Sequence, residues 1–152
     1  MAGLVTERIF KGNPLEVFQG LRRFDQYPKY LPMVSEITVD PPKVPESVAL
    51  VTFKINLVKT FYYSINIFEA PPERLWWNLQ DSNLMKKSNG SWLLVNHGNH
   101  ETKATYSLDI AFKGLIPQMM IDKVTQSSLE PMMDGFQRLV FDTIESSKLI
   151  GK

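Results

Sequence analysis

The sequence reads LEPMMDGFQRLVFDTI from residue 129 to residue 144, and its apolar side chains recur every three or four positions. At 3.6 residues per turn, this spacing places them within about 140° on one side of a helix. Ser128 and Pro131 mark the start, because proline is tolerated in the first turn but not further inside. The stretch predicts an amphipathic helix of roughly 20 residues, about 30 Å long, which can cross a whole sheet.

A repeated strand pattern precedes this helix. Apolar and polar side chains alternate, most clearly in Thr60–Glu69 and Thr102–Phe112, so each stretch has one apolar face. The breaks at residues 70–72 (APP), 88–90 (SNG) and 97–99 (HGN) are typical of turns, and short links imply an antiparallel meander. The predicted strands are Leu4–Phe10, Val34–Val39, Val48–Asn56, Thr60–Glu69, Arg74–Gln80, Ser91–Asn96 and Thr102–Phe112.

Short helices are predicted after the first strand. Asn13 at the N-cap, followed by proline and then glutamate, indicates a helix that continues to about residue 24. A helical turn restarts at Asp25, where the prolines at 28 and 32 are expected to push Tyr27 and Leu31 out of the α region. Another helix is predicted over Gln118–Gln126.

This order of elements predicts an α+β fold. An apolar sheet face and an amphipathic helix are most stable when they bury each other. A chain of 152 residues is long enough for one sizeable core, so we expect a single domain over residues 1–152. We expect a curved antiparallel sheet wrapped around the long C-terminal helix, with two short helices after the first strand.

Composition excludes several classes of function. The chain has no cysteine, which removes disulfide scaffolds, thiolate zinc sites, iron–sulfur clusters and thiol nucleophiles. Its 17 basic and 16 acidic residues argue against a nucleic-acid binder, which usually has a basic excess. No run approaches the roughly 20 apolar residues of a membrane span, and no signal peptide is visible. We therefore expect a cytoplasmic protein without stable membrane insertion.

The sequence predicts no catalytic residue, metal or cofactor. The two histidines lie in His97–Glu101, a predicted hairpin turn without a third histidine or a helical two-histidine motif. The charged strand residues are Glu69, Arg74 and Asp109, and Asp109 alternates with apolar neighbours, so it is expected to face solvent. Neither a Ser-His-Asp spacing nor a glycine-rich phosphate loop is present.

Three stretches point to a known family. Tyr27–Pro32 (YPKYLP) forms an aromatic corner before Val34 and a strand, and Asn89–Trp92 (NGSW) lies at a predicted turn into another strand. Ser107–Phe112 is followed by Gly114–Pro117 (GLIP) and methionine-rich helices. In this order the chain resembles the START-like (SRPBCC) superfamily, in its polyketide cyclase/dehydrase and coenzyme Q-binding branch. The resemblance covers nearly the whole chain and implies a helix-grip fold whose cavity, between sheet and helix, binds hydrophobic molecules.

Aromatic and methionine side chains are the candidate lining of that cavity. Aromatic rings with a few hydroxyls suit an isoprenoid, fatty acyl or polycyclic ligand, and methionine adapts to several ligand shapes. Both residue types also fill ordinary cores, which is the alternative for each position. The candidate pocket residues are Phe53, Tyr63, Ile65, Trp77, Trp92, Tyr106, Leu108, Met119, Met120, Met132, Met133, Phe136 and Val140.

The leading hypothesis is therefore non-enzymatic binding or transport of a hydrophobic small molecule, such as a lipid, a quinone or a polyketide-like compound. Entry is expected through Gly114–Ser128, where glycine, proline and serine interrupt the chain. This hypothesis needs no cofactor and names no protein partner.

Two alternatives stay open, because the family also contains enzymes and a ribosome-associated factor. A polyketide cyclase, aromatase or dehydratase needs polar groups in the cavity, and the candidates are Tyr63, Tyr106, Arg74, Glu69 and Asp109. A protein-interaction module needs an exposed apolar patch. Its candidates are Phe141 and one of the adjacent pair Trp76 and Trp77, whose side chains must point to opposite faces of a strand.

Overall fold

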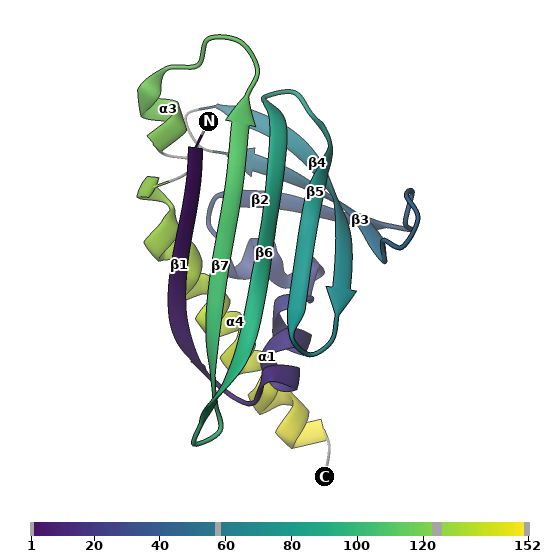
Figure 1. The fold of residues 1–152 in the computed structure, drawn as a ribbon, viewed down its shortest axis with the longest axis vertical. Helices are drawn as coiled ribbons and strands as arrows, with labels where there is room; N and C mark the ends of the chain where they lie inside the picture. Colours follow the sequence, from purple (N-terminus) through teal and green to yellow (C-terminus); the bar gives the residue numbers. More distant parts are fainter. Residues whose placement is uncertain (1, 57–58, 123–125, 151–152) are drawn as a thin grey trace.

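The computed structural model describes residues 2–56, 59–122 and 126–150, which form the elements shown in Figure 1. A 3₁₀ turn, Phe24–Gln26, lies between the first two helices. In chain order the elements are β1 (Ala2–Lys11), α1 (Pro14–Leu21), α2 (Tyr27–Tyr30), β2 (Val34–Asp40), β3 (Ala49–Asn56), β4 (Thr60–Ala70), β5 (Arg74–Ser82), β6 (Met85–Gly98), β7 (Glu101–Phe112), α3 (Gln118–Asp122) and α4 (Leu129–Ile150).

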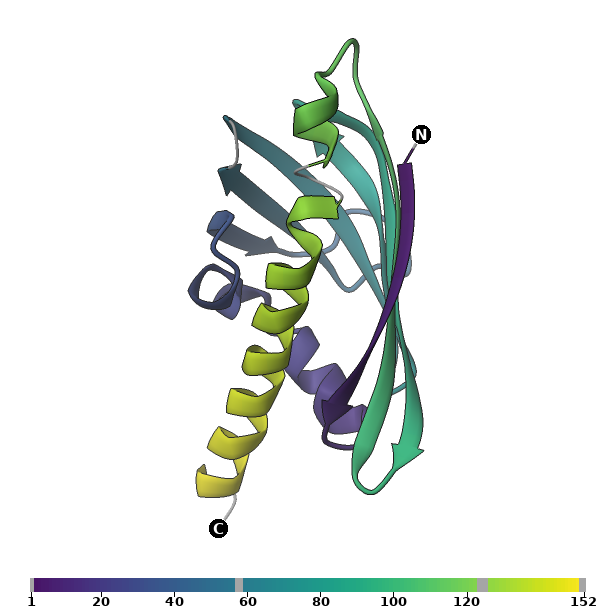
Figure 2. The ribbon, with the colours of Figure 1, turned by 90° about the vertical axis from the view of Figure 1, so that its left-hand side faces the viewer.

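The strands form one seven-stranded antiparallel sheet in the order β1-β7-β6-β5-β4-β3-β2. Strands β2 to β7 are a meander, and β1 joins its far edge beside β7. The sheet is curved, and α4 crosses its open side (Figure 2). The predicted α+β architecture, with a sheet curved around the C-terminal helix, is confirmed.

The apolar side of α4 faces the sheet, as its periodicity predicts. Met133, Phe136, Leu139 and Val140 are buried in the core cluster. Trp92 of β6 is 1% exposed, and its ring lies 5.2 Å from the ring of Phe136, edge to face. These contacts place the core between the middle of the sheet and the middle of α4.

Strand β1 is tied to α4 through polar side chains. Arg8 donates to Asp134 Oδ1 at 2.8 Å and also pairs with Glu130. The Gln137 amide donates to the backbone carbonyl of Ile9 at 3.1 Å. An edge strand normally exposes unpaired backbone groups, so this contact covers part of the β1 edge and holds α4 against the sheet.

The helical segments before β2 differ from the sequence prediction in one respect. Helix α1 starts at Pro14, and the Asn13 side chain accepts a hydrogen bond from the Glu16 N–H at 2.9 Å, as the capping signal predicts. The expectation that Tyr27 leaves the α region is wrong, because its φ is −54° and its ψ is −43°. Pro28 occupies the first turn of α2, where a missing N–H costs nothing, so the helix begins at Tyr27. Leu31 is extended, as predicted.

The largest correction concerns β6. The predicted turn at residues 88–90 lies inside this strand, which begins at Met85 rather than Ser91. The chain reverses before Met85, where the Ser82 hydroxyl accepts hydrogen bonds from the N–H groups of Leu84 and Met85 at 3.0 Å each. Gly90 serves a different purpose, because the ring of Trp77 lies directly against it.

The segment after β7 is described in part. Helix α3 ends at Asp122, and residues 123–125, which belong to the predicted helix Gln118–Gln126 and to the predicted entry segment, lie outside the described residues. Across the described ranges, no helix has both the length and the apolar composition needed to cross a bilayer.

Candidate functional site

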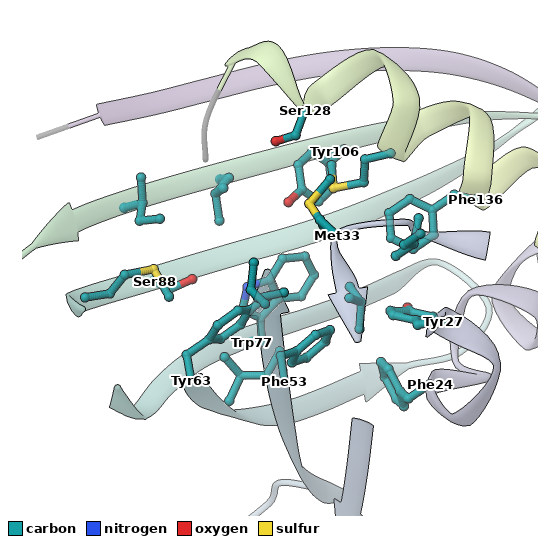
Figure 3. A pocket seen from close by; sticks show the side chains of 18 of the residues that line it. Phe24, Tyr27, Met33, Phe53, Tyr63, Trp77, Ser88, Tyr106, Ser128 and Phe136 are labelled. Carbon is teal, nitrogen blue, oxygen red and sulfur yellow. The ribbon is translucent and has the colours of Figure 1, made fainter. Parts of the chain in front are cut away.

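A cavity of about 110 Å³ lies between the concave face of the sheet and α4 (Figure 3). Strands β2 to β7 supply most of its wall, and the 3₁₀ turn, α2 and the start of α4 complete it. The lining residues are Phe24, Tyr27, Leu31, Met33, Val34, Phe53, Ile55, Phe61, Tyr63, Ile65, Ile67, Leu75, Trp77, Met85, Ser88, Trp92, Tyr106, Leu108, Ile110, Ser128, Met132 and Phe136.

Most of the candidate residues from the sequence lie around this cavity. The candidates on strands occupy the alternate positions whose side chains point inward. Met132 and Phe136 are one helical turn apart on α4. The candidates that line the cavity are Phe53, Tyr63, Ile65, Trp77, Trp92, Tyr106, Leu108, Met132 and Phe136.

Four candidate residues lie elsewhere. Met119 of α3 is 62% exposed, and Met120 is buried in the core cluster without reaching the lining. Met133 is next to Met132 and so points about 100° away around α4. Val140 packs against Gly20 of α1, where an added Cβ would lie 3.0 Å from Val140 atoms. Helix α1 therefore occupies the space beside the later turns of α4.

The lining residues near the aromatic corner, and some on the strands, were not predicted from the sequence. Phe24, Tyr27, Leu31 and Met33 come from the 3₁₀ turn, α2 and the residues before β2, where no periodicity shows which side faces inward. Phe61 and Ile67 share the inward face of β4 with Tyr63 and Ile65. The alternation of apolar and polar side chains along β4 could have identified these two as lining residues.

Aromatic rings form much of the cavity wall. The rings of Phe53 and Tyr63 stack with centroids 4.7 Å apart and an interplanar angle of 2°. The rings of Tyr27 and Phe136, which also line the cavity, pack edge to face with their centroids 5.3 Å apart. The parallel Phe53 and Tyr63 rings present a flat apolar surface, which suits planar or extended apolar molecules.

Two phenol hydroxyls in the lining are available to a ligand. The Tyr27 hydroxyl donates to the Leu21 carbonyl at 2.5 Å. Within the part of the chain that the structure describes, the hydroxyls of Tyr63 and Tyr106 make no hydrogen bond. Burial raises the pKa of both phenols, so they remain protonated donors at neutral pH. A carbonyl or hydroxyl oxygen of a ligand is a suitable acceptor for them.

Charged side chains are absent from the described lining. Glu69 pairs with Arg22 at 2.8 Å, and the Arg74 guanidinium lies 4.3 Å from the ring of Trp76 on the outer face of the sheet. Asp109 pairs with Lys87 at 2.6 Å and is half-buried on that outer face. Of the polar groups considered for catalysis, only Tyr63 and Tyr106 reach the cavity.

The histidine turn has a local partner. His100 Nε2 lies 2.8 Å from a carboxylate oxygen of Glu16, close to the start of α1. The described residues contain no group of three or more histidine, aspartate or glutamate side chains arranged to hold a metal ion.

Gly90 determines where the Trp77 ring can lie, and replacing it with alanine tests this. A Cβ at Gly90 would lie 2.1 Å from Trp77 Cζ2, so the large, rigid indole would have to move. We expect Gly90→Ala to lower the free energy of unfolding by about 1–3 kcal/mol, the usual cost of overpacking. Gly3→Ala is the matched control, because its nearest contact would be an ordinary 3.6 Å. Equal urea midpoints for the two variants would contradict the contact.

The buried phenols predict a loss of stability at alkaline pH. Burial raises the pKa of Tyr27, Tyr63 and Tyr106 above the ordinary value of 10.0. Below that pH the phenols are protonated in both the folded and the unfolded chain, and their contribution to stability is constant. Above it the unfolded chain releases protons that the folded chain retains, so each phenol lowers the unfolding free energy by up to about 1.4 kcal/mol per pH unit.

Urea denaturation on both sides of this pH checks the prediction. We expect Tyr106→Phe to remove its share of the alkaline loss, because phenylalanine has no proton to release. Tyr62→Phe is the same substitution at an exposed position, since Tyr62 is 48% exposed, and the alkaline loss of Tyr106→Phe is compared with that of this variant. An identical alkaline loss in wild type and Tyr106→Phe would be inconsistent with burial of this phenol.

The chain matches one protein family and is similar in fold to several solved structures. Residues 13–137 match the family described as polyketide cyclase / dehydrase and lipid transport. The search of curated proteins found no match to the sequence.

Among solved structures, the chain is similar to a START superfamily protein from Mycobacterium smegmatis, with 14% identity and a TM-score of 0.78 over 92% of this chain and 97% of that one. It is also similar to the Zhui aromatase/cyclase from a Streptomyces species, with 8% identity and a TM-score of 0.75 over 96% of this chain and 94% of that one. At these identities the likeness shows a shared fold, and the chemistry has to be argued from the site.

Proposed function

Because the chain belongs to the polyketide cyclase/dehydrase and lipid transport family, we propose that it binds a hydrophobic small molecule in the cavity between the sheet and α4. The ligand is of the lipid, quinone or polyketide-like class, with an apolar body and at least one oxygen acceptor. The cytoplasmic location and the lack of a nucleic-acid partner remain predictions from the sequence.

One observation carries the proposal: an apolar, aromatic cavity contains two phenol donors that have no partner among the described residues. Ligand sites are commonly apolar hollows with a few polar groups that orient the ligand. Neither phenol oxygen is among the buried unpaired polar atoms of the described residues, so both hydroxyls face open space in which a ligand acceptor can pair with them. Tyr63 and Tyr106 therefore orient the polar end of a ligand whose body contacts the stacked rings.

A cyclase-type enzyme is the second candidate, and the same two phenols favour it. A neutral phenol donates a hydrogen bond to a carbonyl oxygen and stabilises negative charge that develops there. Since burial raises their pKa, Tyr63 and Tyr106 are poor proton acceptors, and the described lining offers no carboxylate or imidazole base. Product analysis after incubation with poly-β-carbonyl compounds separates this role from binding alone.

Retention of a ligand through gentle purification tests the proposed function. We expect native mass spectrometry to show a complex with one apolar molecule, and solvent extraction to release it. For protein that is purified empty, a screen of fatty acids and quinones is expected to give saturable binding at one site. Protein that carries no apolar molecule and binds none of the screened compounds would contradict the proposal.

A further inference from the structure

The outer face of the sheet has a second hollow, which shares part of its wall with the cavity. This outer groove has a volume of about 660 Å³ and lies across β1, β7, β6 and β5. Trp77 and Leu108 line both the outer groove and the cavity. Both residues are paired with a strand on either side, so a ligand that reaches both hollows needs a place where neighbouring strands do not pair.

The gap lies between β5 and β6. These strands pair from Arg74 opposite Leu93 to Trp77 opposite Gly90. Beyond that point, β5 continues beside β4 as far as Ser82, and β6 continues beside β7 from Met85. Residues 78–82 of β5 and 85–89 of β6 are therefore not paired with each other, and this unpaired stretch is here called the sheet fork.

The far end of the sheet fork is held by hydrogen bonds to Ser82. Its hydroxyl accepts from the backbone N–H groups of Leu84 and Met85 and donates to the Tyr62 carbonyl at 2.9 Å. The Lys113 ammonium donates to the Ser82 carbonyl at 2.6 Å. These bonds stabilise the turn that joins the two arms, so the fork is a fixed part of the architecture.

Trp77 separates the two hollows at the near end of the sheet fork. It is half-buried, packs against the core, and lies against Gly90, where any Cβ would overlap its ring. Figure 3 shows the Trp77 side chain among those that line the cavity, and its ring lies 5.9 Å from the ring of Tyr106. The Trp77 side chain is therefore one place where the walls of the cavity and the outer groove meet.

The chemistry of the outer groove differs from that of the cavity. Asp109 Oδ2 pairs with Lys87 and the Arg74 guanidinium lies over Trp76, while Asp109 Oδ1 is buried without a hydrogen-bond partner among the described residues. The side chains of Asn89, Ser91 and Ser107, which also line it, make no hydrogen bond within the described residues. An amide and two hydroxyls with free donors and acceptors suit a neutral, hydroxyl-bearing group better than a charged one.

We propose that the outer groove binds the neutral polar head of an amphiphilic ligand whose apolar part occupies the cavity, and that the ligand connects the two through the sheet fork beside Trp77. The proposal rests on the proposed function, because it needs the cavity to hold the apolar part. It adds a second binding site, with a defined head-group chemistry, on the outer face of the sheet.

A pair of ligands that share one chain tests this arrangement. Octyl β-glucoside carries a neutral hydroxyl-bearing head, and n-octanol supplies the same chain without it. Titration calorimetry with each, below micelle-forming concentrations, is expected to show the glucoside binding at least about tenfold more tightly, as expected for one or two added hydrogen bonds.

Variants of the outer groove identify where the head binds. We expect Asn89→Leu to remove the advantage of the glucoside and to leave octanol binding unchanged. Ser107→Leu is a second groove variant, which keeps the test valid if Asn89→Leu folds poorly. Thr38→Leu is the matched control, because Thr38 is exposed on β2, outside the groove, and it is expected to retain the wild-type difference.

The outcomes separate the two proposals. Equal affinities for octanol and octyl β-glucoside in the wild type would overturn the outer-groove proposal and leave the cavity proposal standing. A glucoside advantage that persists in both groove variants would also overturn it. Binding of neither ligand would contradict the proposed function itself.

Discussion

Replacing Trp92 with alanine is expected to lower the free energy of unfolding by about 3–5 kcal/mol, the range measured for large buried aromatic side chains. Trp92 is 1% exposed, and its ring contacts the rings of Phe10, Tyr106 and Phe136 at 5.9, 5.0 and 5.2 Å. It therefore connects β1, β7 and α4 at the centre of the core. Urea denaturation followed by circular dichroism measures the loss.

Trp76→Ala is the control for this prediction. Trp76 lies on the outer face, stacked with Phe68 at 5.6 Å and beneath the Arg74 guanidinium. Because such a half-exposed stack is worth about 0.5–1.5 kcal/mol beyond its buried area, its loss is expected to cost clearly less. Equal losses in the two alanine variants would show that the core is not centred on Trp92.

Removing both cavity hydroxyls with Tyr63→Phe and Tyr106→Phe is expected to weaken binding of 1,4-naphthoquinone by about 10- to 100-fold, since two hydrogen bonds to its carbonyl oxygens are lost. The rings remain, so the apolar contacts and the stack with Phe53 are retained. Because neither hydroxyl has a partner among the described residues, stability near neutral pH is expected to be unchanged or slightly higher.

Naphthalene is the matched ligand control, because it has the same fused rings without carbonyl oxygens. Its affinity is expected to be the same for wild type and for the double variant. Tyr62→Phe is the matched protein control, since Tyr62 is exposed on the other face of β4. Loss of naphthalene and naphthoquinone binding together would mean that the substitutions distort the cavity rather than remove donors.

Much of the fold could be predicted from periodicity. The alternation in β4 and β7 and the three-and-four spacing in α4 report which side of an element is buried, and burial dominates folding energetics. The resemblance to the polyketide cyclase/dehydrase family is confirmed by the family match, and the expected START-like fold by the similar structures.

Local turn chemistry misled the prediction at Gly90. Ser-Asn-Gly is a favoured turn sequence, but here glycine is required by a contact with Trp77, a residue on another strand. Tyr27 is a second position where a local preference misled the prediction, because the following Pro28 disfavours a helical conformation there. A ring contact with Phe136 and a hydrogen bond to the Leu21 carbonyl stabilise the helical turn. Tertiary contacts of this kind leave no periodic signal.

The sequence predicted which side of each element is buried, but not which buried residues border the cavity. Periodicity places Met133 and Val140 on the inward side of α4, and both are buried there. It does not show that α1 fills the space beside Val140, or that the cavity lies near Met132 and Phe136. The sheet fork had no sequence signal, because it depends on where two strands stop pairing.

Filling the cavity with a larger side chain tests whether the cavity itself is the ligand site. Ser88 is 3% exposed and lines the cavity from β6, so Ser88→Phe adds a ring to that space. Titration with the neutral fluorescent probe N-phenyl-1-naphthylamine is expected to show saturable one-site binding to wild type and to Ser146→Phe, an exposed control on α4, and at least about tenfold weaker binding to a folded Ser88→Phe protein. Equal probe affinity for Ser88→Phe and wild type would show that the cavity is not the ligand site.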